Sequence, residues 1–239
     1  MNLEELKEFI NTEDKVKRAL MGSILADGSI QKQRKSGKQN TSTDYAYLEI
    51  NHTARNLDYL KFKEQLLLKI KGIKTKIAPH NKITENKTYY GYRLSTNAHL
   101  WLREVRDRIY DNDRVKIFPK YDIENFTDLS LFLLYLDDGN LKCRWDETKQ
   151  KFREVRAKFC LNSFTLDELK VFINWLKTKY GIDAKYYRDG IRKNSKLPKN
   201  RGYVVWLNTT NTKKFMEVID KFYNLIPSMN YKFLRFHLL

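Results

Sequence analysis

Two apolar segments that end in Asp-Gly, one in each half of the chain, are the feature that most limits the possible folds. ALMGSILADGSI covers 19–30 and LFLLYLDDGNLK covers 131–142, so Asp27 and Asp138 lie 111 positions apart in a chain of 239 residues. Each acid follows a helix-like run, although the negative end of a helix disfavours an acid by roughly 0.3 to 1 kcal/mol. Asp-Gly is also a common stop-and-turn signal. A single copy therefore carries little information, and the matched pair is what requires an explanation.

The segments after Asp27 predict a mixed order of strands and helices. In YAYLEINHT, apolar and polar residues alternate, which is typical of a half-buried strand. RNLDYLKFKEQLLLKIKG predicts an amphipathic helix that stops at Gly72, and NAHLWLREVRDRIYDND predicts a further helix. The strands that we expect in this half cover 29–35, 45–53, 73–79 and 88–96.

The second half repeats this order of elements, and short stretches of its sequence resemble stretches of the first half. NHTARNLDYLKF corresponds to NSFTLDELKVF, GIKTKI to GIDAKY, and WLREVRDRIY to FMEVIDKFY. We therefore expect an α+β fold made of two αββαββα units related by a pseudo-twofold axis, each with a four-stranded antiparallel sheet. The expected units cover 1–112 and 127–239, and 113–126 is the expected linker, in which Pro119 breaks any helix.

Small residues on the first apolar segment predict how the units meet. Gly22 and Ala26 are four positions apart, with Ala19 on the same face, so another helix backbone can approach closely. Pairing the two segments side by side brings Asp27 and Asp138 together at one end.

The paired acids predict a metal site. Two carboxylates at two helix ends attract divalent cations, and hard oxygen ligands favour Mg²⁺. The preceding residues, Ala26 and Asp137, are included in the expected metal site. Gly28 and Gly139 are expected to form left-handed caps that turn each helix into its first strand.

The charge of the chain indicates a polyanionic partner. Its 46 Lys and Arg against 29 Asp and Glu leave a formal charge of +17. Nucleic acid is favoured over a membrane surface, because the basic residues are spread along the chain without a compact cluster beside an amphipathic helix. The two cysteines form no CxxC pair and the four histidines no HExxH spacing, so a zinc site is not indicated. The start lacks a secretory signal, and we expect a soluble protein inside the cell, in the cytoplasm of a bacterial or phage host or in an organelle.

The segments LMGSILADG and LFLLYLDDG resemble the two signature motifs of the single-chain LAGLIDADG homing endonucleases. Asp27 and Asp138 occupy the position of that family's metal-binding catalytic carboxylate. Leu133 stands where the second motif would have Gly, which bears on how symmetric the helix pair is. The resemblance implies a saddle of two sheets on DNA, with the motif helices packed at its centre.

The resemblance also implies an activity and its cofactors. A monomer would make a metal-dependent staggered double-strand cut, with 3′ overhangs, in a long, non-palindromic DNA target. Mg²⁺ would be the cofactor, Mn²⁺ would substitute, and Ca²⁺ would support binding without cleavage. RVKIFP and IPSMNYKF resemble family segments that carry a basic catalytic residue, which implies Lys116 and Lys232. The alternative for each is an ordinary solvated lysine.

The alternation of the strands predicts which side chains face DNA. Gln and Asn suit adenine, and Arg and Lys suit guanine or phosphate. In the first half these residues are Gln31, Gln33, Lys35, Tyr45, Tyr47, Asn51, Lys74, Lys76 and Arg93; in the second they are Lys142, Arg144, Arg156, Lys158, Asn162, Lys185 and Tyr187. The basic loops 31–43 and 188–202 are expected to clamp flanking phosphates.

Two other functions fit the same sequence pattern. One is an RNA maturase that binds host intron RNA and assists splicing, and the other is a non-catalytic DNA-binding protein of the same fold. Retention of both Asp27 and Asp138 favours the nuclease.

Overall fold

The computed structural model describes residues 3–33, 45–84, 87–189 and 200–233. The first half of the chain comprises α1 (Leu3–Phe9), α2 (Glu13–Leu25), β1 (Ser29–Lys32), β2 (Ala46–Thr53), α3 (Leu57–Leu67), β3 (Thr75–Pro79), β4 (Lys82–Thr84), β5 (Lys87–Tyr89), β6 (Gly91–Thr96) and α4 (Leu100–Ile109). The second half comprises α5 (Lys120–Glu124), α6 (Asp128–Asp138), β7 (Gly139–Asp146), β8 (Lys151–Phe159), α7 (Leu166–Tyr180), β9 (Lys185–Arg188), β10 (Tyr203–Trp206) and α8 (Thr209–Ile219). Short 3₁₀ turns cover Ala54–Asn56, Asp220–Leu225 and Pro227–Lys232. None of these helices is long and apolar enough to cross a membrane.

The two halves have the same topology, which confirms the predicted α+β fold. One four-stranded sheet has the order β1-β2-β6-β3 and the other has the order β7-β8-β10-β9, and all neighbouring strands are antiparallel. Each unit therefore reads αββαββα. The hairpin β4–β5 is an addition that the sequence pattern did not predict.

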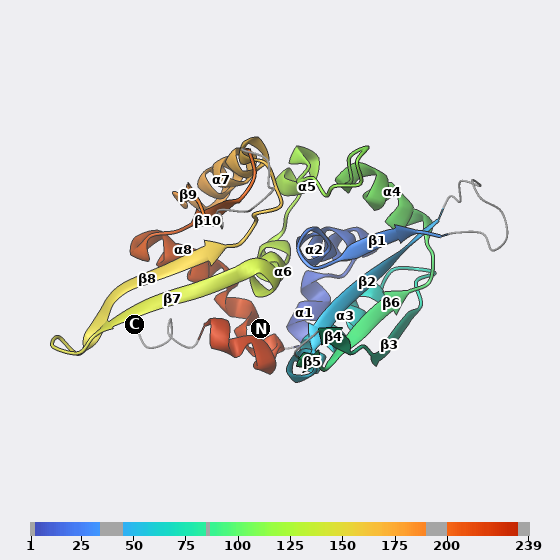
Figure 1. The fold of residues 1–239 in the computed structure, drawn as a ribbon, viewed down its shortest axis with the longest axis horizontal. Coiled ribbons are helices and arrows are strands. Elements are labelled where there is room, and N and C mark those ends of the chain that lie inside the picture. The colour runs from blue at the N-terminus through green and yellow to red at the C-terminus, as the bar shows by residue number, and fades with distance from the viewer. Residues whose placement is uncertain (1–2, 34–44, 85–86, 190–199, 234–239) are drawn as a thin grey trace.

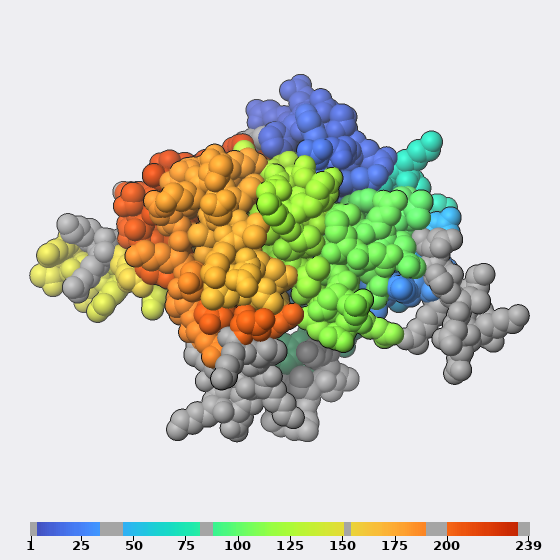
Figure 2. Space-filling model, turned by 90° about the horizontal axis from the view of Figure 1, so that it is seen from above, coloured from blue at the N-terminus to red at the C-terminus, as the bar shows by residue number. Residues whose placement is uncertain are grey.

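The expected alternation along β2 is present. Ala46, Leu48 and Ile50 are fully buried, whereas Tyr45 and Asn51 are exposed. Buried residues of both halves form one continuous hydrophobic cluster that includes α2 and α6. The outer helices α4, α5 and α7 cover one side of the molecule across both halves (Figure 2).

Helices α2 and α6 lie side by side at the centre of the molecule (Figure 1). A Cβ atom at Gly22 would lie 1.9 Å from the carbonyl oxygen of Ser130, so only glycine permits this separation. The Ser130 hydroxyl donates a hydrogen bond of 2.8 Å to the carbonyl oxygen of Arg18. The predicted close helix contact is thus present. It is asymmetric, because Leu133 occupies the position that corresponds to Gly22.

Gly28 and Gly139 do not form left-handed caps, so this prediction was wrong. Gly139 has a φ of −87°, and Gly28 is not among the glycines with positive φ. Glycine is required for space instead. A Cβ at Gly28 would lie 2.7 Å from Cα of Ile24, and one at Gly139 would lie 2.3 Å from the carbonyl oxygen of Tyr135. Each strand therefore leaves its helix by folding tightly against the last helical turn.

The segment expected to be a linker is folded against the second half. Pro119 precedes the short helix α5 and does not prevent it, since proline is well tolerated at a helix start. The buried ring of Phe118 packs 4.8 Å from the ring of Phe164. Arg108 in α4 makes two hydrogen bonds of 2.8 Å to the carboxylate of Asp122 in α5. The segment therefore fixes the path of the chain between the units.

The contact at Gly22 generates a stability prediction. Gly22→Ala must push α2 and α6 apart, and overpacking of this kind costs roughly 1–3 kcal/mol. The gain in helix propensity, about 1 kcal/mol, offsets only part of this cost. We expect urea denaturation to show a net loss of about 1–2 kcal/mol. Lys61→Ala, at an exposed position of α3, is the control and should change stability by less than about 0.5 kcal/mol. A stabilised Gly22→Ala protein would contradict the close contact.

Candidate functional site

A lysine side chain reaches the C-terminal end of each central helix. Nζ of Lys116 lies 2.7–3.1 Å from the last carbonyl oxygens of α2 and its turn, those of Ile24, Leu25, Ala26 and Gly28. Nζ of Lys232 contacts the carbonyl oxygens of Tyr135, Leu136 and Gly139 at the end of α6. The last three positions are 111 residues after 24, 25 and 28, so the two lysines are equivalent by the pseudo-twofold symmetry. Their charges offset the negative helix ends.

Asp27 lies two residues beyond the end of α2, and Asp138 is the last residue of α6. Desolvation raises the pKa of Asp27 to about 6, with a further contribution from the charge of Asp137. Desolvation also raises the pKa of Asp138 to about 7, and the charge of Asp27 contributes to this increase. Lys116 and Lys232 act in the opposite direction at both carboxyls. Burial and the neighbouring acids therefore disfavour the ionised carboxylates more than Lys116 and Lys232 favour them.

Asp137 is engaged differently from its neighbour Asp138. Its carboxylate is fully buried, and Nζ of Lys63, also fully buried, lies 2.8 and 2.9 Å from its two oxygens. The Ser23 hydroxyl donates a third hydrogen bond, of 2.7 Å. Although burial opposes ionisation, Lys63 and the hydrogen bonds hold the pKa of Asp137 below its usual range. Because Lys63 and Ser23 belong to the first half, this ion pair joins the two repeats.

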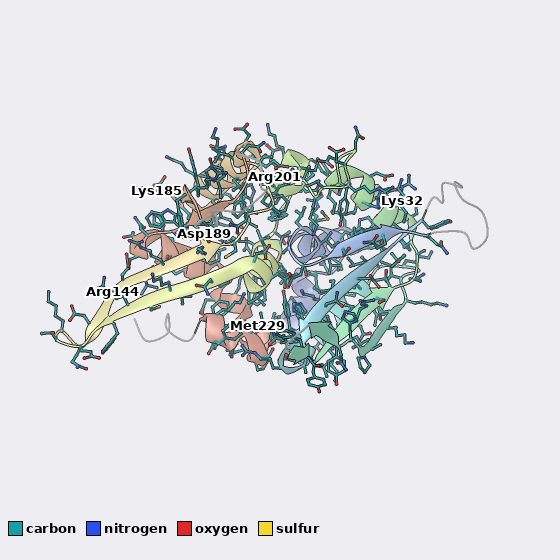
Figure 3. The ribbon with its side chains drawn as sticks, viewed as in Figure 1. Lys32, Arg144, Lys185, Asp189, Arg201 and Met229 are labelled. Carbon is teal, nitrogen blue, oxygen red and sulfur yellow. The ribbon has the colours of Figure 1, made fainter. Side chains whose placement is uncertain are left out.

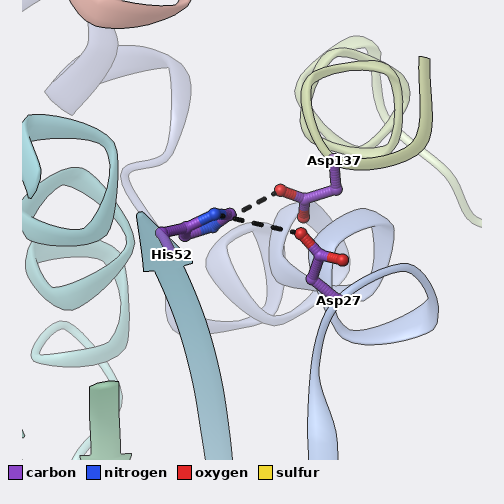
Figure 4. A group of neighbouring side chains, drawn as sticks. All are labelled: Asp27, His52 and Asp137. Atoms are coloured by element: carbon purple, nitrogen blue, oxygen red, sulfur yellow. Dashed lines mark ion pairs between the residues drawn. The ribbon is translucent and has the colours of Figure 1, made fainter. Parts of the chain in front are cut away.

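His52 lies between the two halves as well (Figure 4). Its Nε2 is 2.8 Å from Nζ of Lys63, and its Nδ1 is 4.0 Å from Oδ2 of Asp27. Desolvation and the charge of Lys63 lower the pKa of His52 to about 3, so the ring is neutral. The Lys63 ammonium also lies 4.0 Å from the centre of the buried Tyr59 ring.

The acids of this site differ in whether a lysine already balances their charge. Asp27, His52 and Asp137 each offer a ligand atom within 4.8 Å of the others. However, the Lys63 ammonium already lies within 2.9 Å of Asp137 and His52, where it supplies the positive charge itself. In the part of the chain that the structure describes, no Lys or Arg lies within 4.0 Å of either the Asp27 or the Asp138 carboxylate. These two acids therefore have oxygen atoms and charge available for a hard cation.

Ala26 and Asp137 were also predicted to bind the metal ion, and in both cases a contact with a lysine would compete with the ion. Ala26 can offer only its carbonyl oxygen, which is 3.0 Å from Nζ of Lys116. A cation at Asp137 would have to displace Lys63. Both roles remain predictions that the contacts of Lys116 and Lys63 disfavour.

Most residues that were predicted to face DNA in the first half lie on the outer side of their sheet. Gln31 is opposite Tyr47, and Asn51 is opposite Arg93, in the strand register. The remaining residues of this set, Gln33, Tyr45, Lys74 and Lys76, are exposed. The Arg93 guanidinium contacts Asn51 at 3.1 Å. Lys35 and most of loop 31–43 lie outside the described residues.

The second sheet carries a more basic outer face. Lys142 is opposite Arg156 in the register, Lys158 is opposite Trp206, and Lys185 is opposite the same Trp206. Arg144, Lys185 and Tyr187 are exposed, and Arg144 lies far along the hairpin, on the opposite side of the molecule from Lys32 (Figure 3). Asn162 follows the end of β8 and is half-buried, so it is not on the strand face. Most of loop 188–202 lies outside the described residues.

Lys63 and His52 were not predicted as site residues. One signal for Lys63 was present, because it lies four positions after Tyr59 and three before Leu66, on the apolar face of its helix. A lysine in that stripe needs a buried partner. His52 carried no such signal, since its neighbours come from segments distant in sequence.

Comparisons with known proteins agree with this architecture. The model of the LAGLIDADG DNA endonuclease family matches residues 17–215. The chain is 25% identical over 221 residues to Protein RecA of Mycobacterium gastri, and this match covers 91% of this chain and 47% of that protein. It is 26% identical over 216 residues to the cytochrome b mRNA maturase bI2 of Debaryomyces hansenii, and this match covers 89% of this chain and 71% of that protein. The chain thus spans about half the length of the RecA relatives that it matches.

One solved structure shares the fold closely. The homing endonuclease I-WcaI, bound to its DNA recognition sequence, superposes with a TM-score of 0.67 at 17% identity. The match covers 97% of this chain and 92% of that protein.

The buried Lys63–Asp137 pair generates a prediction for stability. Lys63→Met or Asp137→Asn leaves one partner buried without its counter-charge or strongest hydrogen bonds, which typically costs about 3–5 kcal/mol. The double variant should lose at least about 1 kcal/mol less than the sum of the two single losses. Urea denaturation of all four proteins measures this coupling. Lys120→Met, which breaks an exposed pair with Glu124, is the control, with an expected change below about 0.5 kcal/mol. Additive losses would show that the pair is not coupled.

The raised pKa of Asp138 generates a second prediction, for the metal-free protein in EDTA. A folded-state pKa of about 7, above the ordinary 3.8, means that stability falls as the pH rises from about 4 to 7. Asn cannot ionise, so Asp138→Asn should raise Tm by a few degrees at pH 8, at about 2–4 °C per kcal/mol. The gain should vanish near pH 4. The exposed Asp113→Asn is the control, and a lower Tm for Asp138→Asn at pH 8 would refute the cost of burying an ionised Asp138 beside Asp27.

Proposed function

Because the chain belongs to the LAGLIDADG DNA endonuclease family, we propose that it is a site-specific, metal-dependent endonuclease that acts on double-stranded DNA. The observation that carries this proposal is the pair of acids at the ends of two closely packed helices, Asp27 and Asp138, between two sheets with basic outer faces. A formal charge of +17 supports a polyanionic substrate.

Asp27 and Asp138 would hold the divalent cation, with Mg²⁺ as the physiological ion and Mn²⁺ as a substitute. When bound, such an ion polarises a phosphoryl oxygen and stabilises the charge that develops on the leaving 3′ oxygen. The carboxylates of the two halves would serve one DNA strand each, in a staggered cut. Each acid must be ionised to do this, and the raised pKa values predict that activity increases between about pH 6 and 8.

Lys116 and Lys232 would contribute positive charge near the scissile phosphates. Desolvation lowers the pKa of Lys116 to about 8, and it also lowers the pKa of Lys232. An ammonium has three hydrogens, and Lys116 already lies near four carbonyl oxygens. We therefore assign these lysines an electrostatic role and the task of fixing the helix ends, in preference to orienting a water molecule.

The outer faces of the two sheets would contact the DNA on either side of the cut. Arg and Lys on these faces suit guanine or phosphate, and Gln31, Gln33 and Asn51 suit adenine. Because the first sheet is richer in amides and the second in cations, we propose a non-palindromic target that one chain recognises as a monomer. DNA as substrate also implies that the protein acts inside the cell.

A second function is favoured by one observation, the 26% identity to a cytochrome b mRNA maturase. In that case the same basic faces would bind folded intron RNA. Selection from a randomised duplex library in Ca²⁺, followed by transfer to Mg²⁺, separates the two functions. Discrete DNA ends after transfer support the endonuclease. Tight binding to structured RNA, with no DNA cut under any condition, supports the maturase.

The selected duplex then tests the catalytic acids. Asp27→Asn and Asp138→Asn should each bind the duplex in Ca²⁺ with an affinity near that of the wild type. In Mg²⁺ each should lose cleavage of at least one strand by more than about 100-fold, because an acid that holds the cation has been removed. Asp113→Asn is the matched control and should cut normally. Undiminished double-strand cutting by either site variant would refute the assigned role.

A further inference from the structure

The site contains an asymmetric group of side chains that the repeated motifs do not explain. His52, near the end of β2, faces both Asp27 of its own half and Asp137 of the other half (Figure 4). Its Nδ1 is 4.0 Å from Oδ2 of Asp27, and its side chain is only 9% exposed. The ring is therefore held in place beside one of the two acids proposed to hold the cation.

Lys63 determines which ring nitrogen carries the proton. An ammonium has three donors and no acceptor, so Nε2 of His52, at 2.8 Å, must accept a hydrogen bond from Lys63. The neutral ring then has its N–H at Nδ1, on the side of Asp27. A separation of 4.0 Å is too long for a direct hydrogen bond, and a small movement of either side chain or a bridging water would close it. Asp137 holds Lys63 in turn, with two contacts of 2.8 and 2.9 Å.

The second half has no equivalent of this arrangement. Gln31 lies opposite Tyr47, and Lys142, 111 positions after Gln31, lies opposite Arg156, so residues of β2 and α3 correspond to those 109 positions later. This register sets Leu161 against His52 and Phe172 against Lys63. Leu161 and Phe172 are both buried, and the ring of Phe172 lies 5.5 Å from that of Phe118. Asp137 itself corresponds to Ala26, 111 positions earlier. The second half therefore has no counterpart of these three side chains.

We propose that His52 is a positioning residue for Asp27, that the Lys63–Asp137 pair fixes its N–H toward that carboxylate, and that the two halves of the site are therefore unequal. The expected consequence is that the two DNA strands are cut at different rates, and this consequence rests on the proposed endonuclease function. The N–H of His52 orients the Asp27 carboxylate, as partners of metal-ligating side chains commonly do. Asp138 lacks such a partner in the aligned segment of its own half.

The test compares three variants by single-turnover cleavage of the selected duplex, with each strand labelled separately. His52→Ala should slow one strand by about 10–100-fold, the usual effect of losing such a partner, and leave the other within about 3-fold. On a supercoiled plasmid, nicked circles should accumulate. His52→Asn keeps an N–H near the position of Nδ1 and should restore most of the lost rate. Ser163→Ala, at an exposed position two residues after Leu161, is the control and should cut both strands normally.

Two measurements on the full chain without DNA separate a failure of this inference from a failure of the proposed function. ¹⁵N NMR of the metal-free protein should show His52 protonated at Nδ1 alone, and Lys63→Met should abolish that preference. Mn²⁺ titration followed by EPR should show weaker binding by about 10–100-fold for His52→Ala and no change for Ser163→Ala. If the wild type cuts no DNA, the endonuclease proposal fails, and these two results still support or overturn the role of His52. An Nε2-protonated ring, unchanged Mn²⁺ affinity, or equal slowing of both strands would overturn it.

Discussion

The close approach of α2 and α6 at Gly22 is the constraint on which the rest of the structure depends. The absence of a side chain at this one position lets the helix backbones touch, with the Ser130 carbonyl where a Cβ would lie. This contact brings the C-terminal ends of two helices, and the acids at these ends, to the same place. Both sheets start from these ends, through Gly28 and Gly139, so their separation is set by the same contact. The hydrophobic core is continuous across it.

Bringing two negative helix ends and their acids together costs electrostatic energy. Three buried or half-buried lysines reduce this cost. Lys116 and Lys232 cap the two helix ends in equivalent positions, and Lys63 neutralises the additional acid, Asp137. Among the three acids at the two helix ends, Asp27 and Asp138 have no lysine within 4.0 Å in the part of the chain that the structure describes. The compensation is therefore selective, and it leaves negative charge at the point where a divalent cation would act on a bound duplex.

The repeat order, both sheets and the central helix pair were predictable because apolar periodicity and the Asp-Gly pair are local signals that occur twice. The conformations of the glycines were not predictable. Gly139 must be a glycine because a side chain there would clash with Tyr135, and not because of its own φ. The equivalence of Lys116 and Lys232 is hidden in the sequence, because one precedes its nearby proline and the other follows it. His52 was missed because its partners, Asp27 and Lys63, meet it only after folding. The apolar periodicity of the sequence thus indicates which face of a helix or strand is buried, whereas the contacts between the two repeats are visible only in the three-dimensional structure.

The central claim is that two acids from different repeats share one negatively charged site. The most direct measurement is a pH titration of the aspartate carboxyl carbons by ¹³C NMR in the metal-free protein. The account predicts that Asp27 and Asp138 titrate near pH 6 and 7, and that Asp27→Asn lowers the pKa of Asp138 by removing its charged neighbour. Titration of both carboxyls near pH 4, with Asp138 unaffected by the substitution, would contradict it.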